Sequence, residues 1–131
     1  MTAKLRSRVR KRARNRCEYC LIPLAHDALP GQIDHIIATQ HDGSSQYGNL
    51  AMACGHCNLH KGPNIAGIDR ATKALVALFN PRKDRWRLHF RYEGAYLMAL
   101  TPVGRVTLRL LQINHGRKVR LREELMKADL F

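Results

Sequence analysis

The sequence predicts an α+β fold, in which a short β-hairpin lies between two pairs of cysteines and a helix begins at the second pair, with a basic helix before them and a second hairpin and further helices after them. Three observations support this fold class. Two Cys-x-x-Cys turns, Cys17/Cys20 and Cys54/Cys57, frame a short apolar run with an Asp-His pair at its centre, which is typical of a strand. Apolar residues recur at helical spacing near both ends of the chain. Residues 85–91 alternate apolar with basic or polar side chains, and a Glu-Gly turn follows them.

Residues 2–16 predict a basic helix. An apolar side chain recurs at every fourth position, at Leu5, Val9 and Ala13. Arginine and lysine fill the other faces, so we expect the helix to pack its narrow apolar stripe on the cysteine module. Its basic faces, which include Arg10 and Arg14, are also placed to contact phosphate groups.

The segment between the cysteine pairs predicts a β-hairpin, and a helix follows it at the second pair. Residues 32–37 and 49–53 are short apolar runs, and the polar, glycine-containing segment 41–48 joins them as a loop. A helix is expected over residues 57–62, where a Gly-Pro pair stops it.

The pattern changes after Pro63. The elements expected there are, in order, a helix over 70–79, a strand over 85–91, a strand over 96–100 and helices over 102–112 and 117–128. Asn80-Pro81 ends the first of these helices, and Thr101-Pro102 begins the next. We therefore divide the chain into residues 1–63, which hold the cysteine module, and residues 64–131, a C-terminal extension of helix, hairpin and helices that packs on it.

The composition favours a polyanionic partner. The chain has 131 residues, with 23 Lys and Arg against 10 Asp and Glu, and a formal net charge of +13. Nucleic acid is the commonest partner of such a charge, although a ribosomal or membrane-surface protein shares the balance. No run approaches the roughly 18 apolar residues of a membrane span, and there is no secretory signal, so we expect a cytoplasmic, reducing environment.

The cysteines predict a structural zinc site. Zinc favours four ligands in a tetrahedron, and each Cys-x-x-Cys turn places two thiolates on one ion. In a reducing compartment, paired cysteines bind metal or do redox chemistry more often than they form disulfides. A redox dithiol or four unlinked core cysteines are the alternatives, but neither explains why the pair is duplicated.

An Asp-His pair and an asparagine are candidates for a second, catalytic site. Adjacent side chains on a strand point to opposite faces, so Asp34 is placed to reach a metal ion while His35 addresses a substrate from another side. Alone, such a pair is a weak signal. Its context strengthens it, because Asn58 opens the helix after the second cysteine turn, and the zinc would hold Asn58 in place relative to the strands.

Four stretches have a specific order and spacing: Cys17-x-x-Cys20, Ile33-Asp34-His35-Ile36, Asn49-Leu50, and the run Cys-Gly-His-Cys-Asn-Leu-His-Lys-Gly over residues 54–62. Together they resemble the HNH endonucleases, also called ββα-metal or His-Me finger nucleases, over roughly residues 5–63. The final metal-ligand position, commonly histidine in that family, is Asn58 here, a variant found in some members such as phage Holliday-junction resolving endonucleases. Residues 79–114 also look like a tail carried by a group of bacterial HNH proteins.

The resemblance implies a zinc-stapled ββα-metal fold over residues 1–63 and an endonuclease activity. Asp34 and Asn58 would bind one divalent ion. His35 would be the general base that deprotonates the attacking water, and Asn49 would orient the loop and His35. Oxygen ligands favour Mg²⁺ or Mn²⁺ at this second site, and an imidazole titrates near neutral pH, as such a base must.

The expected partner is DNA. The residues proposed to bind nucleic acid are Lys61, His60, Arg10, Arg14, Arg105 and Arg109. We expect a DNA endonuclease, and a homodimer if one active site per chain is to cut both strands. The alternative is a non-catalytic, zinc-stabilised module that binds nucleic acid. Asp34 separates the two hypotheses, because a pure phosphate binder gains nothing from a carboxylate beside its phosphate site.

Overall fold

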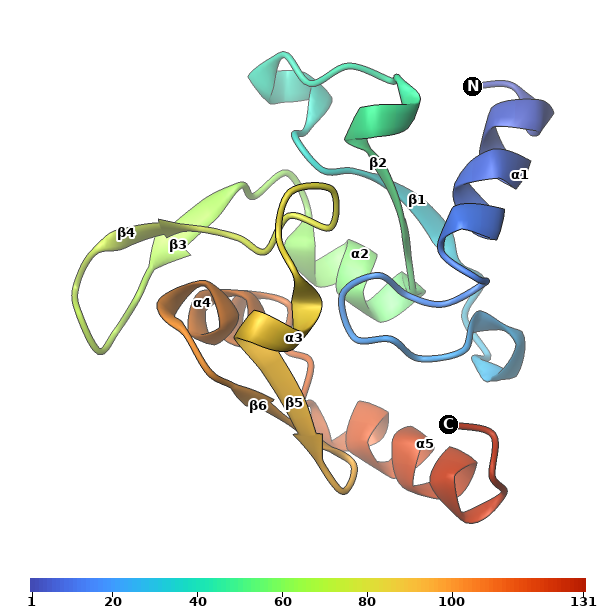
Figure 1. Cartoon of the computed structure of the whole chain (residues 1–131), viewed down its shortest axis with the longest axis vertical. Helices are drawn as coiled ribbons and strands as arrows, with labels where there is room; N and C mark the ends of the chain where they lie inside the picture. The colour runs from blue at the N-terminus through green and yellow to red at the C-terminus, as the bar shows by residue number, and fades with distance from the viewer.

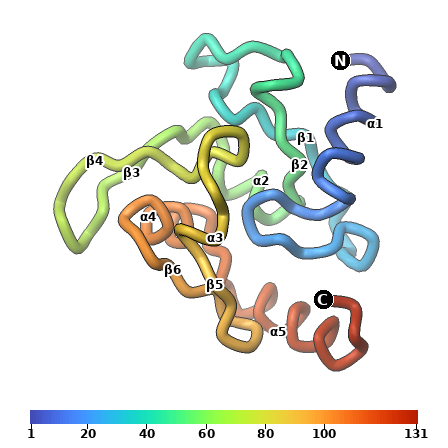
Figure 2. Tube along the Cα trace, in the orientation of Figure 1, coloured from blue at the N-terminus to red at the C-terminus, as the bar shows by residue number.

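The computed structural model describes residues 1–131, which form three separate two-stranded antiparallel hairpins with helices around them (Figure 1). In chain order the helices and strands are α1 (Ala3–Arg12), β1 (Gln32–His35), β2 (Leu50–Ala53), α2 (Gly55–Lys61), β3 (Ala66–Ile68), β4 (Leu75–Ala77), α3 (Trp86–His89), β5 (Phe90–Glu93), β6 (Tyr96–Ala99), α4 (Pro102–Leu110) and α5 (Gly116–Lys127). This mixture confirms the α+β class. Figure 2 shows α2 near the middle of the molecule, with both chain ends on the same side in that view. None of the helices has both the length and the apolar character that crossing a bilayer requires.

The N-terminal helix attaches to the first hairpin through its apolar stripe. Val9 is fully buried, and α1 packs on β2. The Arg12 guanidinium adds polar contacts, because it donates hydrogen bonds to the carbonyl oxygens of Tyr47 (2.9 Å) and Leu50. The helix predicted over residues 2–16 is confirmed, although it ends at Arg12.

A hairpin followed directly by a helix forms the centre of the fold. β1 and β2 pair with Asp34 opposite Ala51, and all four residues of β2 are buried. The Cys54 thiol caps α2 by accepting a hydrogen bond from the Cys57 backbone amide (3.4 Å). Gly62, whose φ of 50° suits glycine, ends the helix. These elements were predicted, and α2 begins two residues earlier than expected.

The helix predicted over residues 70–79 is wrong, because this region forms the β3–β4 hairpin. Its turn is stabilised locally: the Asp69 carboxylate accepts hydrogen bonds from the amide and the hydroxyl of Thr72, and the Lys73 amide donates to the Asp69 carbonyl (2.7 Å). Such side-chain contacts compete with helical hydrogen bonds. The hairpin also packs on α4, so tertiary contacts override the helical pattern. In this hairpin Leu75 is 72% exposed.

The strand predicted over residues 85–91 is correct only at residues 90–91. Residues 86–89 form the single turn of α3, and the strand β5 begins only at Phe90. The apolar residues of this segment fit a helix as well as a strand, because Trp86 and Phe90 are four positions apart and their ring centroids lie 5.2 Å from each other. The turn at Gly94, strand β6 and helices α4 and α5 form where the sequence placed them.

One hydrophobic cluster of 21 buried residues connects the two parts of the chain. It contains the four cysteines and residues of α1 and β2, and it continues into the extension through Phe90, Leu97 and Ile113. The extension thus packs against the cysteine module rather than standing apart from it.

Candidate metal centre and active site

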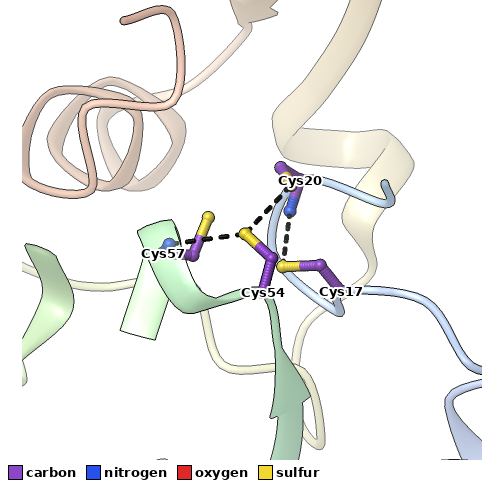
Figure 3. A group of neighbouring side chains, drawn as sticks. All are labelled: Cys17, Cys20, Cys54 and Cys57. Atoms are coloured by element: carbon purple, nitrogen blue, oxygen red, sulfur yellow. Dashed lines mark hydrogen bonds between the residues drawn. The ribbon is translucent and has the colours of Figure 1, made fainter. Parts of the chain in front are cut away.

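The four cysteines converge on one point. Cys17 and Cys20 belong to the turn after α1, whereas Cys54 and Cys57 belong to the start of α2 (Figure 3). All four are fully buried, and their sulfur atoms lie within 4.8 Å of one another. The Sγ atoms of Cys20 and Cys54 are 3.8 Å apart. A tetrahedron with zinc–sulfur bonds of 2.3 Å has edges of about 3.8 Å, so the cluster has the size of a zinc site.

Charge also favours a cation at the cluster. Hydrogen bonds from the three neighbouring thiols lower the pKa of Cys54, and burial raises the pKa of Cys17 well above that of a free thiol. Four thiolates can therefore share this space only with a cation among them. A divalent ion that prefers sulfur fits both the donors and the distances, so the cluster is positioned to hold a structural zinc ion.

A second candidate site lies at a cavity of about 300 Å³ near the cysteine cluster. Its lining residues are Ile33, Asp34, His35, Ala38, Thr39, Gln40, Asn58, Gly62 and Pro63. The end of β1 supplies Asp34 and His35, and α2 supplies Asn58. The structure thus brings together the three residues that the sequence suggested for an ion and a base. A carboxylate and an amide at one cavity supply the oxygen donors that a hard divalent cation prefers.

Asp34 is held tightly at the wall of this cavity. Its side chain is 5% exposed; Oδ2 accepts a hydrogen bond from the Tyr19 hydroxyl (2.6 Å), and Oδ1 accepts one from the Lys61 ammonium (3.1 Å). Burial raises the pKa of Asp34, while Lys61 and Tyr19 act in the opposite direction. Each carboxylate oxygen keeps one lone pair free for a further ligand.

His35 and Asn49 are connected through the loop that joins β1 to β2. The His35 Nε2 atom lies 2.9 Å from the Ser45 hydroxyl. The Asn49 side chain accepts a hydrogen bond from the Ile37 amide (2.9 Å) and donates to the carbonyl oxygens of Ile37 (2.9 Å) and Ser44 (2.7 Å). Asn49 therefore fixes the loop on which the partner of His35 lies, and it does not line the cavity.

The basic residues proposed to bind nucleic acid lie in different surroundings. Lys61 is buried, with its ammonium turned to Asp34 rather than to the surface. Arg105 makes two hydrogen bonds to the Asp69 carboxylate, both of 3.0 Å, and Arg109 donates to the Ile68 carbonyl.

The remaining three proposed nucleic-acid residues are closer to solvent. Arg10 and Arg14 are exposed at the end of α1 and in the turn after it. His60 is half-buried, and its ring lies against that of His56, with 4.4 Å between the centroids.

Two contacts, one at Asp34 and one on α1, have no clear sequence signal. Tyr19 lies between the first two cysteines, and nothing in its neighbourhood indicates that it donates to Asp34. Tyr47 lies under two guanidinium groups of α1, with Arg8 at 4.3 Å and Arg12 at 3.8 Å from its ring centroid. Finding these contacts requires knowing how the turn, the hairpin and α1 pack together.

Comparison with known proteins agrees with the geometry. The family model described as HNH endonuclease matches residues 17–64, a segment that contains all four cysteines and all the residues that line the candidate cavity. Comparisons with curated proteins and with solved structures give no match. The family match indicates a nuclease or nucleic-acid-binding function. Residues 17–64 thus match the HNH endonuclease family model, and the four cysteines of this segment are positioned to bind a metal ion.

Proposed function

We propose that this protein is a metal-dependent endonuclease that hydrolyses phosphodiester bonds in DNA. The observation that carries the proposal is that Asp34, His35 and Asn58 line one cavity beside the cysteine cluster. A general base, an anionic metal ligand and a neutral one at a shared opening are the components that metal-assisted hydrolysis needs.

Each residue has a role that follows from its position. Asp34 and Asn58 would hold one Mg²⁺ or Mn²⁺ ion, which neutralises charge on the phosphate and the leaving oxygen when bound. His35 takes a proton from the water whose oxygen forms a bond to phosphorus. The bond from phosphorus to the 3′ oxygen breaks, and that oxygen leaves with the bonding pair and is then protonated, which gives 5′-phosphate and 3′-hydroxyl ends. Asn49 holds the loop that carries the Ser45 partner of His35.

DNA is the proposed substrate because the charge and the exposed basic groups suit a long polyanion. The chain carries a net charge of +13, and Arg10 and Arg14 are exposed. Counterion release from phosphates favours such binding without a requirement for sequence. One cavity per chain would cut one strand, so a double-strand cut would need a homodimer with two such cavities.

One observation favours the non-catalytic alternative, a zinc-stabilised module that only binds nucleic acid. Both oxygens of Asp34 already have protein partners, and Lys61 supplies the opposite charge. Under this alternative Asp34 is a structural residue, and Asp34→Ala would not reduce DNA affinity. The two hypotheses therefore differ in whether any cleavage occurs.

The test is nicking of supercoiled plasmid with Mg²⁺ or Mn²⁺, comparing the wild type with His35→Ala. We expect the wild type to nick the plasmid and the variant to lose about 10²- to 10⁴-fold in rate, because it lacks the general base. His41→Ala is the matched control, since His41 is exposed in the same loop and does not line the cavity. No nicking by the wild type with any divalent ion would contradict the proposal and favour the binding module.

A further inference from the structure

A buried lysine of the C-terminal helix reaches the cysteine cluster. The ammonium of Lys118, in α5, lies 3.1 Å from Oδ2 of Asp27 and 3.7 Å from Sγ of Cys54. The Lys118 and Asp27 side chains are 4% and 5% exposed. Lys118 lies outside residues 17–64, the part of the chain that the family model covers.

Burying an ammonium group is unfavourable unless it is paired and hydrogen-bonded. Asp27, in the loop between the first cysteine turn and β1, supplies the opposite charge and orients the Lys118 ammonium. The other partner of the ammonium is the sulfur of Cys54. A long, flexible side chain thus lies where its charge can act on the cluster.

The chemistry of a four-cysteine zinc site explains why a donor would be placed there. Four thiolates and one divalent ion leave a net charge of −2 in the core, and N–H donors to sulfur stabilise that charge. Cys54 Sγ already accepts a hydrogen bond from the Cys57 amide at 3.4 Å. Lys118 adds a second donor, and it is the one that carries a charge.

Other residues of the extension form hydrogen bonds with both cysteine turns. The Tyr92 hydroxyl donates to the Cys20 carbonyl (2.5 Å), and the Trp86 indole donates to the Tyr19 carbonyl (2.8 Å). At the second turn, Nε2 of His56 lies 2.8 Å from the carbonyl of Gln112.

We propose that the C-terminal extension forms the outer shell of the zinc site, with Lys118 as its charged hydrogen-bond donor to the Cys54 thiolate. Because ligands are held by the groups around them, zinc affinity depends on this extension. The coupling is reciprocal, so bound zinc also holds α5 against the module. The proposal does not depend on nuclease activity.

The test measures zinc retention against a chromogenic zinc chelator in the zinc-loaded full chain. Lys118→Met is expected to weaken zinc binding by about 10- to 100-fold, the usual effect of removing an outer-shell partner. Lys127→Met is the matched control on the same helix, because Lys127 is 74% exposed and contacts only Glu124. Lys118→Arg keeps a charged donor and should recover part of the loss.

A spectroscopic measurement separates a contact with sulfur from simple helix packing. In the Co²⁺-loaded protein, loss of a hydrogen bond to a thiolate raises the energy of the sulfur electrons. The thiolate-to-cobalt charge-transfer band should therefore move to longer wavelength in Lys118→Met and stay in place in Lys127→Met. Unchanged zinc retention and an unshifted band in a folded Lys118→Met would overturn the proposal.

A second pair of variants applies if Lys118→Met does not fold. Tyr92→Phe removes only the hydroxyl that donates to Cys20, and Tyr96→Phe is its control, because Tyr96 is 54% exposed in the same hairpin. Faster zinc release in Tyr92→Phe alone supports the outer shell. Equal release in both variants contradicts it.

Discussion

Lys61 shows how one side chain connects the helix to the candidate site. Its ammonium donates to Oδ1 of Asp34 (3.1 Å) and to the carbonyl oxygens of His35 (3.1 Å) and Ile36 (3.2 Å). All three N–H groups therefore have an acceptor, and the side chain is 1% exposed. Lys61 ties the end of α2 to β1 and neutralises the carboxylate that faces the cavity.

Replacing Lys61 should destabilise the protein strongly. Lys61→Met keeps most of the side-chain volume but leaves the Asp34 carboxylate buried without its countercharge, which costs about 3–5 kcal/mol. Urea unfolding of the zinc-loaded protein measures this loss. The exposed Lys127→Met should change the free energy of unfolding by less than about 0.5 kcal/mol. Equal stability of the two variants would mean that the Lys61–Asp34 pair contributes nothing to the fold.

The sequence could indicate that the motif residues lie together, but not which side chains contact them. The spacing of the cysteines and the Asp-His pair is local information, and it suggested that Asp34, His35 and Asn58 lie together. In the structure all three line one cavity. The hydrogen bond from Tyr19 to Asp34 joins residues 15 positions apart, and that of Lys61 joins residues 27 positions apart. Such contacts depend on how the elements pack, which no periodicity encodes.

At the scale of elements, the loop from β1 to β2 is shaped by a close backbone approach. Gly43 lies so near the Ile37 carbonyl that a Cβ atom there would be 1.7 Å from its oxygen. The same loop carries Ser45, the partner of His35, and is held by Asn49. Any side chain at position 43 must therefore displace the backbone of this loop.

Gly43→Ala should therefore impair cleavage without releasing zinc. A displacement of about 1 Å at a catalytic group can lower the rate by about 10²-fold, so we expect a loss of one to two orders of magnitude, roughly, in plasmid nicking. Gly48→Ala is the control in the same loop, because a Cβ atom there meets nothing within 4 Å. Full activity in Gly43→Ala would show that the loop does not position His35.

Elements with local start and stop signals were predictable, and those formed by tertiary contacts were not. Thr101 caps α4 by accepting from the Gly104 amide (3.1 Å), and Gly62 ends α2; both signals are visible in the sequence. The β3–β4 hairpin has no such signal. Gly67 lies against α4, and a Cβ atom added to it would be 2.9 Å from a side-chain carbon of Val106 and 2.8 Å from one of Leu110. The hairpin therefore depends on a helix about forty residues away in the sequence.

At the scale of the whole molecule, charge should dominate DNA affinity. The net charge of +13 predicts binding to duplex DNA that weakens steeply with salt. If about six phosphates are neutralised, affinity should fall by about 10³-fold between 50 and 200 mM salt. Fluorescence anisotropy with His35→Ala measures binding without cleavage, and affinity that does not change with salt would exclude a phosphate-tracking surface.

Anomalous X-ray diffraction from crystals of the zinc-loaded protein soaked in Mn²⁺ most directly tests whether the two metal sites are separate and differ in chemistry. We predict a zinc peak among the four cysteine sulfur atoms and a distinct manganese peak between Asp34 and Asn58, within reach of His35. A zinc peak at the cysteines with no manganese at the cavity, even at saturating Mn²⁺, would contradict a catalytic role for this site.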